Sequence, residues 1–132
     1  MPPAKDLDEL IIYYYKGSRY PSWMFGRPQK LALHDCSRLV SIPEDSELFT
    51  HLRELHFMYC DWDRLPENME RLVSLQKLFI FDCDKMELLP TLPQSLLKIN
   101  IVWCGVLGTT CKEEGHENWH KIHHIPDKVI FP

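Results

Sequence analysis

The sequence predicts an α/β solenoid, in which short parallel strands stack side by side and irregular or short helical segments return across the other side. Three observations predict this fold. One spacing of apolar residues recurs in five stretches of the chain. Four of the five cysteines fall at one position of that spacing, at intervals of 24, 23 and 21 residues. The spacing, Leu-x-x-Leu-x-Leu-x-x-Cys, has the period of a leucine-rich repeat. We therefore expect about five leucine-rich repeats, with a short parallel sheet on the concave face.

The five stretches supply the strands. They are LDELIIYYY, PQKLALHDC, LRELHFMYC, LQKLFIFDC and LLKINIVWC, which begin at residues 7, 28, 52, 75 and 96. Within each one, apolar residues alternate with period two, as in a strand that buries one face. One such strand cannot bury that face alone. Stacking the copies gives a ladder of leucines and isoleucines, and each fully buried side chain contributes roughly 1.5–3 kcal/mol.

The cysteines of the repeat, Cys36, Cys60, Cys83 and Cys104, are expected where each strand ends and the chain turns away. A small, weakly polar thiol can be buried at a turn without a large desolvation cost. Because the residue recurs once per repeat, we interpret it as structural rather than as a redox or metal-binding group. The odd total of five cysteines, without an N-glycosylation sequon, favours a reducing, cytoplasmic compartment.

The segments that return between strands are marked by proline. After Pro66, apolar residues at every third position predict a short helix or a 3₁₀ turn over residues 69–75. The stretch LPTLPQS contains two prolines and predicts an extended crossing without a helix. In the first return, KGSRYPSWMFGR, we expect Trp23 and Met24 to fill the core.

Composition and charge exclude several functions. The net charge of -4 gives no basic surface for nucleic acid, so no nucleic-acid partner is expected. No apolar run approaches the roughly 18 residues of a membrane span. Neither G-x-x-x-x-G-K-[ST] nor G-x-G-x-x-G occurs, so we expect no phosphate-binding loop and no cofactor.

Three stretches resemble the C-terminal leucine-rich-repeat segment of plant nucleotide-binding leucine-rich-repeat disease-resistance proteins of the coiled-coil type. They are YYKGSRYPSWM, LPENMERLVSLQKLFIFDC and, most specific, the tail CKEEGHENWHKIHHIPDKVIF. The resemblance implies a non-catalytic protein-recognition module in plant defence. Such a module senses pathogen effectors or holds the receptor's nucleotide-binding domain inactive. The family's nucleotide-binding and signalling modules have no counterpart here, so we expect a fragment, a truncated product or a degenerate copy.

The expected division of the chain is leucine-rich repeats over residues 1–111, with an uncapped N-terminal edge, and a capping tail over residues 112–132. The last repeat of a solenoid needs a cover that is apolar inward and polar outward. The residues expected to fold onto that repeat and seal it are Trp119, Ile122, Ile125, Val129, Ile130 and Phe131.

The tail also contains an HExxH pattern, His116-Glu-Asn-Trp-His120, which can hold zinc on one helix face. A zinc-dependent hydrolase is therefore the alternative function. The rest of such a site is missing, since His123 and Pro126 stand where one continuation places a glycine and a third histidine. We expect no catalytic residue and no metal site, and leave open only adventitious divalent-metal binding by His116, His120 and His124.

Functional residues are expected between the ladder positions, because their side chains point to the concave face. Aromatic residues and methionine are favoured at protein–protein contacts, and charges at their rim. The alternative is that Phe79 and Phe81 only pack on each other across neighbouring strands. The predicted protein-binding residues are Ile11, Tyr13, His34, His56, Met58, Phe79, Phe81, Val102 and Trp103, with Tyr14 and Tyr59 extending the patch.

Overall fold

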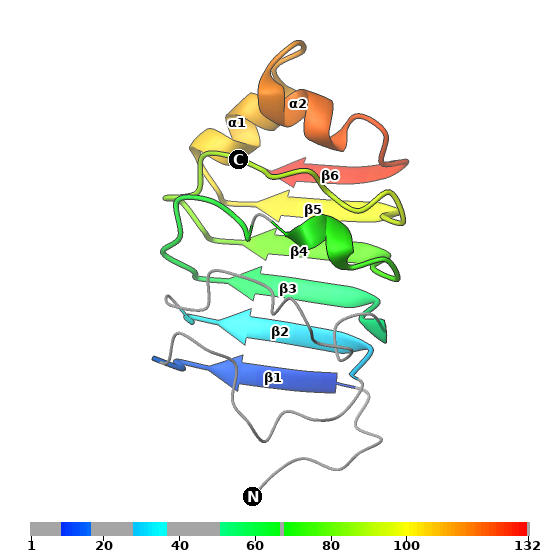
Figure 1. Ribbon diagram of the computed structural model, residues 1–132. Coiled ribbons are helices and arrows are strands. Elements are labelled where there is room, and N and C mark those ends of the chain that lie inside the picture. The colour runs from blue at the N-terminus through cyan, green and yellow to red at the C-terminus, as the bar shows by residue number, and fades with distance from the viewer. Residues whose placement is uncertain (1–8, 17–27, 37–50, 67, 132) are drawn as a thin grey trace, which may run out of the picture.

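The computed structural model describes residues 9–16, 28–36, 51–66 and 68–131. They form one sheet of six strands in sequence order, each parallel to the next and stacked one above another (Figure 1). This arrangement confirms the leucine-rich-repeat solenoid, with one strand more than the five predicted copies. The strands are β1 (Glu9–Tyr13), β2 (Lys30–His34), β3 (Glu54–Met58), β4 (Lys77–Phe81), β5 (Lys98–Val102) and β6 (Asp127–Phe131).

The strands pair in an unshifted register, so the same position of every repeat lies in one column. Two columns point into the core, and in β1 to β5 none of their side chains is more than 9% exposed. These columns are Leu10, Leu31, Leu55, Leu78 and Ile99, and Ile12, Leu33, Phe57, Ile80 and Ile101. The alternation of apolar residues therefore fixed both the register and the buried face.

The repeat cysteines form a third buried column, at the turn that follows each strand. Their thiols donate to backbone carbonyls of the preceding repeat, as from Cys36 to Ile12 at 3.3 Å and from Cys104 to Ile80 at 3.5 Å. Burial raises the pKa of the Cys36 and Cys104 thiols, which keeps them protonated and able to donate. All five cysteines are free. The predicted structural role of the repeat cysteines is confirmed.

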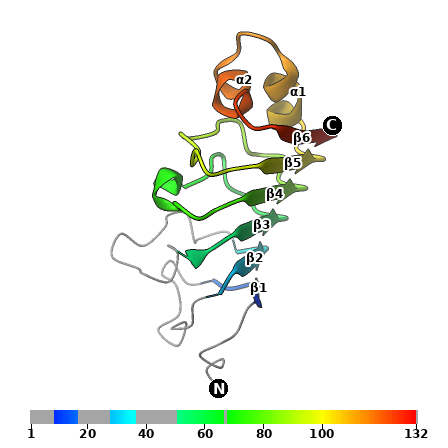
Figure 2. The same ribbon diagram turned by 90° about the vertical axis from the view of Figure 1, so that its right-hand side faces the viewer.

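The described return segments, which follow β3 and β4, cover one side of the sheet (Figure 2). The 3₁₀ helix η2 (Met69–Arg71) lies there, and Met69, Leu72 and Leu75 are fully buried, as the sequence predicts. Residues 90–97 cross without a helix, which is also as predicted. Figure 2 shows the described returns and η2 on one side and the bare strands on the other. We call this uncovered side, predicted to be concave, the open face.

Some predictions fall outside the described residues. The expectation that Trp23 and Met24 fill the core is one, and the expectation of an uncapped edge before β1 is another. The predicted boundary between repeats and tail stays a prediction, and helix α1 (Val106–Lys112) runs across residue 111.

Residues 106–131 form two short helices and then a strand. Helices α1 and α2 (Glu117–Ile122) lie together at the end of the sheet, and β6 follows them as a sixth parallel strand beside β5 (Figure 1). Ile125 is buried, as predicted. The prediction that Val129 and Phe131 seal the core is wrong, since these side chains are 44% and 59% exposed. Because β6 repeats the alternation of the other strands, both side chains point to the open face instead.

A buried polar side chain fixes α2 in place. Asn118 is fully buried, and its Nδ2 donates to the carbonyl of Glu87 at 2.7 Å and to Oγ1 of Thr110 at 2.8 Å. Its Oδ1 accepts from the backbone N–H of Leu89 at 2.9 Å. The amide therefore joins α2 to α1 and to the return segment between β4 and β5.

Candidate functional site

The open face consists of columns that run across all six strands. From the amino ends of the strands to their carboxyl ends, the first column is charged, the second is mixed and the third is mainly aromatic and apolar. They are Glu9, Lys30, Glu54, Lys77, Lys98 and Asp127; Ile11, Ala32, His56, Phe79, Asn100 and Val129; and Tyr13, His34, Met58, Phe81, Val102 and Phe131. The predicted alternation, which places residues between the ladder positions on this face, is confirmed, and β6 adds one residue to each column.

The structure brings the nine predicted binding residues to this face. Ile11, Tyr13 and Trp103 are exposed. The others are half-buried between their neighbours on adjacent strands, namely His34, His56, Met58, Phe79, Phe81 and Val102. Val129 and Phe131 belong to the same surface and were missed as surface residues, because Lys128 stands at a ladder position of their strand and hides the repeat pattern.

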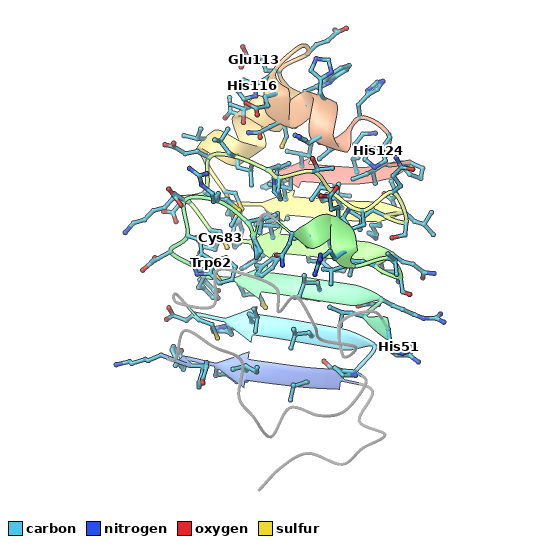
Figure 3. The ribbon with its side chains drawn as sticks, in the orientation of Figure 1. His51, Trp62, Cys83, Glu113, His116 and His124 are labelled. Carbon is cyan, nitrogen blue, oxygen red and sulfur yellow. The ribbon has the colours of Figure 1, made fainter. Side chains whose placement is uncertain are left out.

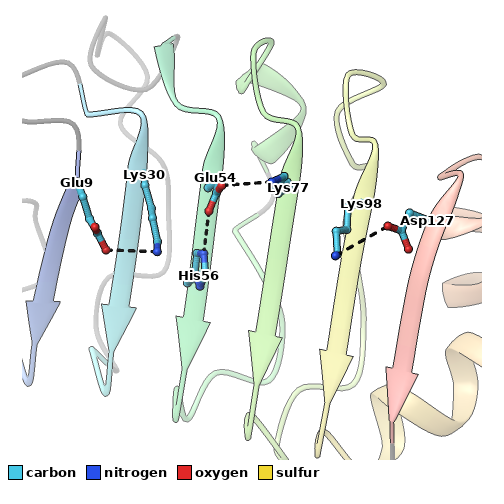
Figure 4. Close-up of polar contacts among 7 residues, drawn as sticks. All are labelled: Glu9, Lys30, Glu54, His56, Lys77, Lys98 and Asp127. Carbon is cyan, nitrogen blue, oxygen red and sulfur yellow. Dashed lines mark hydrogen bonds and ion pairs between the residues drawn. The ribbon is translucent and has the colours of Figure 1, made fainter.

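The charges of the first column compensate one another. Ion pairs join neighbouring strands from Lys30 to Glu9 at 3.3 Å, from Lys77 to Glu54 at 3.6 Å and from Lys98 to Asp127 at 3.8 Å (Figure 4). Such partly exposed pairs contribute little to stability, about 0–1 kcal/mol each. The six charges of this column therefore balance in three strand pairs.

His56 connects the charged column to the aromatic part of the face. Its Nε2 lies 3.3 Å from Oε2 of Glu54, and its ring centroid lies 4.3 Å from that of Phe79. Burial lowers the pKa of His56, although Glu54 partly opposes this shift. Burial alone would raise the pKa of Glu54, but the hydrogen bond from His56 and the charge of Lys77 outweigh it and lower that pKa. Glu54 is therefore held in its charged form.

The residue after each of the first five strands has a left-handed backbone. Tyr14, Asp35, Tyr59, Asp82 and Trp103 have φ between 53° and 58°. Each backbone N–H donates to the last carbonyl of the next strand, at 2.8–3.0 Å. The conformation ends the strand and turns the following residue, a cysteine in four of the five turns, into the core. The side chains at these five positions stay at the carboxyl edge of the open face.

Rings from this edge and from the third column contact one another in sequence from β1 to β5. The centroid distances are 5.8 Å for Tyr14–His34, 4.9 Å for His34–Tyr59, 5.7 Å for Tyr59–Phe81 and 5.0 Å for Phe81–Trp103. Contacts of this kind fall within the 4.5–7 Å range of favourable aromatic pairs. We call these five residues the aromatic rim.

A small hollow lies on the open face between β3, β4 and β5. Its volume is about 150 Å³, and its lining includes His56, Met58, Phe79, Phe81 and Val102. Asn100 also lines it, and the Oδ1 of this residue is buried without a hydrogen-bond partner. The hollow is largely apolar, and its chemistry fits a side chain of a protein partner better than a polar substrate.

The HExxH pattern does not form a zinc site. His116 is the N-cap of α2, and its Nδ1 accepts from the N–H of Asn118 at 3.0 Å. His116 and His124 lie at opposite ends of α2 (Figure 3). Trp119 lies between His120 and His123, with ring centroids 5.1 Å and 4.2 Å away. Over the described ranges, no three or more His, Cys, Asp and Glu side chains are grouped so that they could hold a metal ion.

In the described part of the chain, no helix has the length and apolar character needed to cross a bilayer.

Comparison with known proteins gives the family of the first repeats. No solved structure matches the chain. Residues 1–60 match the family model described as R13L1/DRL21 LRRs, a type that is normally non-catalytic and that implies protein binding. Residues 1–60 are thus leucine-rich repeats of the R13L1/DRL21 type, as found in plant NLR resistance proteins.

Proposed function

We propose that the chain is a non-catalytic recognition module of a plant immune receptor, and that it binds its partner protein through the open face. The observation that supports this most is the exposure of large apolar side chains there, with Tyr13 57%, Trp103 50% and Phe131 59% exposed. Aromatic residues are enriched at protein–protein contacts, and exposed patches of them mark interaction sites. Stacked repeats also suit this use, because they present one continuous surface.

Packing between strands accounts for only part of this surface. Phe81 lies between Tyr59 and Trp103, and Phe79 lies against His56, so these rings do stabilise one another. Contacts between neighbouring rings do not account for the large exposed fractions of Tyr13, Trp103 and Phe131. The hydrophobic effect favours a partner that covers these side chains.

The partner is a protein, and in a receptor of this type it is either a pathogen effector or the receptor's own nucleotide-binding domain, which the module would hold inactive. We place this activity in the cytoplasm. The five free cysteines support that assignment, because a reducing compartment keeps such thiols unpaired.

The test is binding of the purified chain to two sets of proteins. One is the nucleotide-binding domain of a plant NLR with R13L1/DRL21 repeats, and the other is a panel of effectors. For any partner that binds, Phe81→Ala should weaken affinity at least about tenfold, because truncating a central aromatic contact costs more than about 1 kcal/mol.

The matched control is Val73→Ala, which removes an apolar side chain that is 65% exposed and follows η2 on the covered side of the sheet. It should leave affinity unchanged. Far-UV circular dichroism should be the same for both variants and the unmodified chain. A partner that binds equally well to Phe81→Ala would show that the open face is not the contact surface.

A further inference from the structure

Three rings at the carboxyl edge of the open face occupy positions that do not suit them. Tyr14, Tyr59 and Trp103 have the left-handed backbone that glycine, asparagine and aspartate adopt at least cost. Their side chains are 42–62% exposed, so burial in the core does not hold them there. Strained residues of this kind gather at functional sites, where the strain positions a side chain for a ligand.

Two carboxylates alternate with these rings. Asp35 follows β2 and Asp82 follows β4, each half-buried and each at the same turn position as the aromatic residues. Within the described residues, neither carboxylate has a hydrogen bond or an ion pair. The acids of the charged column, by contrast, each have a lysine beside them. Among the described residues of the strands and of the turns that end them, the carboxylates without an ion pair are therefore those of Asp35 and Asp82, which lie among the rings of the aromatic rim.

In the described segments that follow these turns, the exposed charges balance. Asp61, Asp63 and Asp84 stand against Lys16, Arg64 and Lys85. Asp35 and Asp82 would repel an anionic group placed among the rings. A wholly apolar partner would cover Asp35 and Asp82 without pairing them, which carries a large desolvation cost.

A guanidinium group can bind both the exposed rings and the carboxylates of Asp35 and Asp82. It is planar and weakly hydrated, it stacks on aromatic faces, and it donates two parallel hydrogen bonds to a carboxylate. A lysine ammonium is strongly hydrated, and it has neither a planar group that stacks on a ring nor two parallel N–H donors for a carboxylate. The chemistry of the edge therefore favours arginine over lysine, and any cation over an anion.

We propose that the aromatic rim, with Asp35 and Asp82, binds an arginine-bearing segment of the partner protein. This inference rests on the proposed function and names the chemistry of its partner. Since β2 and β4 are two strand spacings apart, the two carboxylates are separated by roughly 10 Å. Two arginines three residues apart on a polyproline II segment have nearly that separation, roughly 9 Å.

The test uses the full 132-residue chain, labelled with ¹⁵N, and the peptide acetyl-PRPPRP-amide. Matched peptides with lysine or glutamate in place of arginine serve as controls. The arginine peptide should shift the indole N–H signal of Trp103 and bind at least about fivefold more tightly than the lysine peptide. The glutamate peptide should not bind. An equal affinity for all three, or no shift with the arginine peptide, would overturn the inference.

Substitutions then test which carboxylates contribute to binding of the arginine peptide. Asp35→Asn and Asp82→Asn keep a residue that tolerates the left-handed backbone, so both should fold. Each should weaken binding of the arginine peptide about threefold to tenfold. Asp127→Asn, which removes a paired acid at the opposite edge of the open face, should not change it. Unchanged binding in both Asp35→Asn and Asp82→Asn would also overturn the inference.

Failure of this inference is distinct from failure of the proposed function. If a partner protein loses affinity on Phe81→Ala while the arginine peptide shows no preference, the open face remains the contact surface and the arginine inference is wrong. If a partner protein binds Phe81→Ala normally, the proposed function itself is wrong.

Discussion

The side-chain oxygen of Asn118 accepts a hydrogen bond of 2.9 Å from the backbone N–H of Leu89, a residue of the preceding return segment. The same amide donates to the carbonyl of Glu87 at 2.7 Å. One buried side chain thus makes the hydrogen bonds that the N–H of Leu89 and the carbonyl of Glu87 would otherwise make with water. The end of the solenoid is therefore fixed by a polar contact as well as by apolar packing.

Asn118→Leu keeps the shape of the side chain and removes its hydrogen bonds. Each buried backbone group left without a partner costs roughly 1–3 kcal/mol, so thermal unfolding should shift to clearly lower temperature. Glu114→Ala, an exposed change in the turn between α1 and α2, should alter the free energy of unfolding by less than about 0.5 kcal/mol. Equal melting temperatures for the two variants would contradict this role of Asn118.

Leu55 tests the buried ladder. It is fully buried in β3 and pairs with Leu31 and Leu78 in its column. Leu55→Ala should cost roughly 2–5 kcal/mol, because it leaves a cavity between repeats that contact only their neighbours. Chemical denaturation measures this cost, and Val73→Ala, on the exposed side of the returns, is the control. A neutral Leu55→Ala would mean that this column is not the core.

Tyr59→Asn tests whether the ring of Tyr59 contributes to partner binding or to the stability of the fold. Asparagine adopts the left-handed backbone at lower cost than tyrosine, and this gain offsets the lost ring contacts with His34 and Phe81. The free energy of unfolding should therefore change by less than about 1 kcal/mol. Partner affinity should fall, because a ring of the aromatic rim is lost. The control is Tyr13→Asn, where the residue lies within β1 and no strain is relieved. A large destabilisation by Tyr59→Asn would show that the ring serves stability instead.

His56 predicts a pH dependence of stability. Burial holds its pKa below the ordinary 6.5, so the unfolded chain takes up a proton at this position more readily than the folded chain. Its contribution is therefore complete above about pH 6.5 and declines as pH falls from there toward the lower folded pKa. His56→Gln should make the melting temperature fall less steeply between about pH 7 and 5. Identical slopes would contradict the assignment.

Much of the fold was predictable because two patterns act together, the alternation within each strand and the recurrence from repeat to repeat. Leu78 and Ile80 alternate within their strand, and Cys83 recurs at the repeat period, so both strand face and register follow from the pattern. The strand β6 was not predicted. It places Lys128 in the ladder column where other strands have leucine or isoleucine, and so has no repeat signature.

The candidate site was predictable as a surface but not in its geometry. Alternation places Tyr13 and Phe81 on the open face, as the structure has them. The left-handed turn at Trp103 could not be predicted from residue type, since a bulky aromatic residue rarely adopts it. Asn118 carries no local signal for burial either, because its backbone partners at Glu87 and Leu89 lie 31 and 29 residues away along the chain.

The open face is the surface that we propose a partner covers. Site-specific photo-crosslinking tests this directly, with p-benzoyl-phenylalanine placed at Phe81 or at Val73 in the chain expressed in plant cells. Mass spectrometry should identify crosslinks from position 81 to a nucleotide-binding domain, or to an effector supplied with the chain, and none to that protein from position 73. Crosslinks to the partner from position 73 and not from position 81 would contradict it.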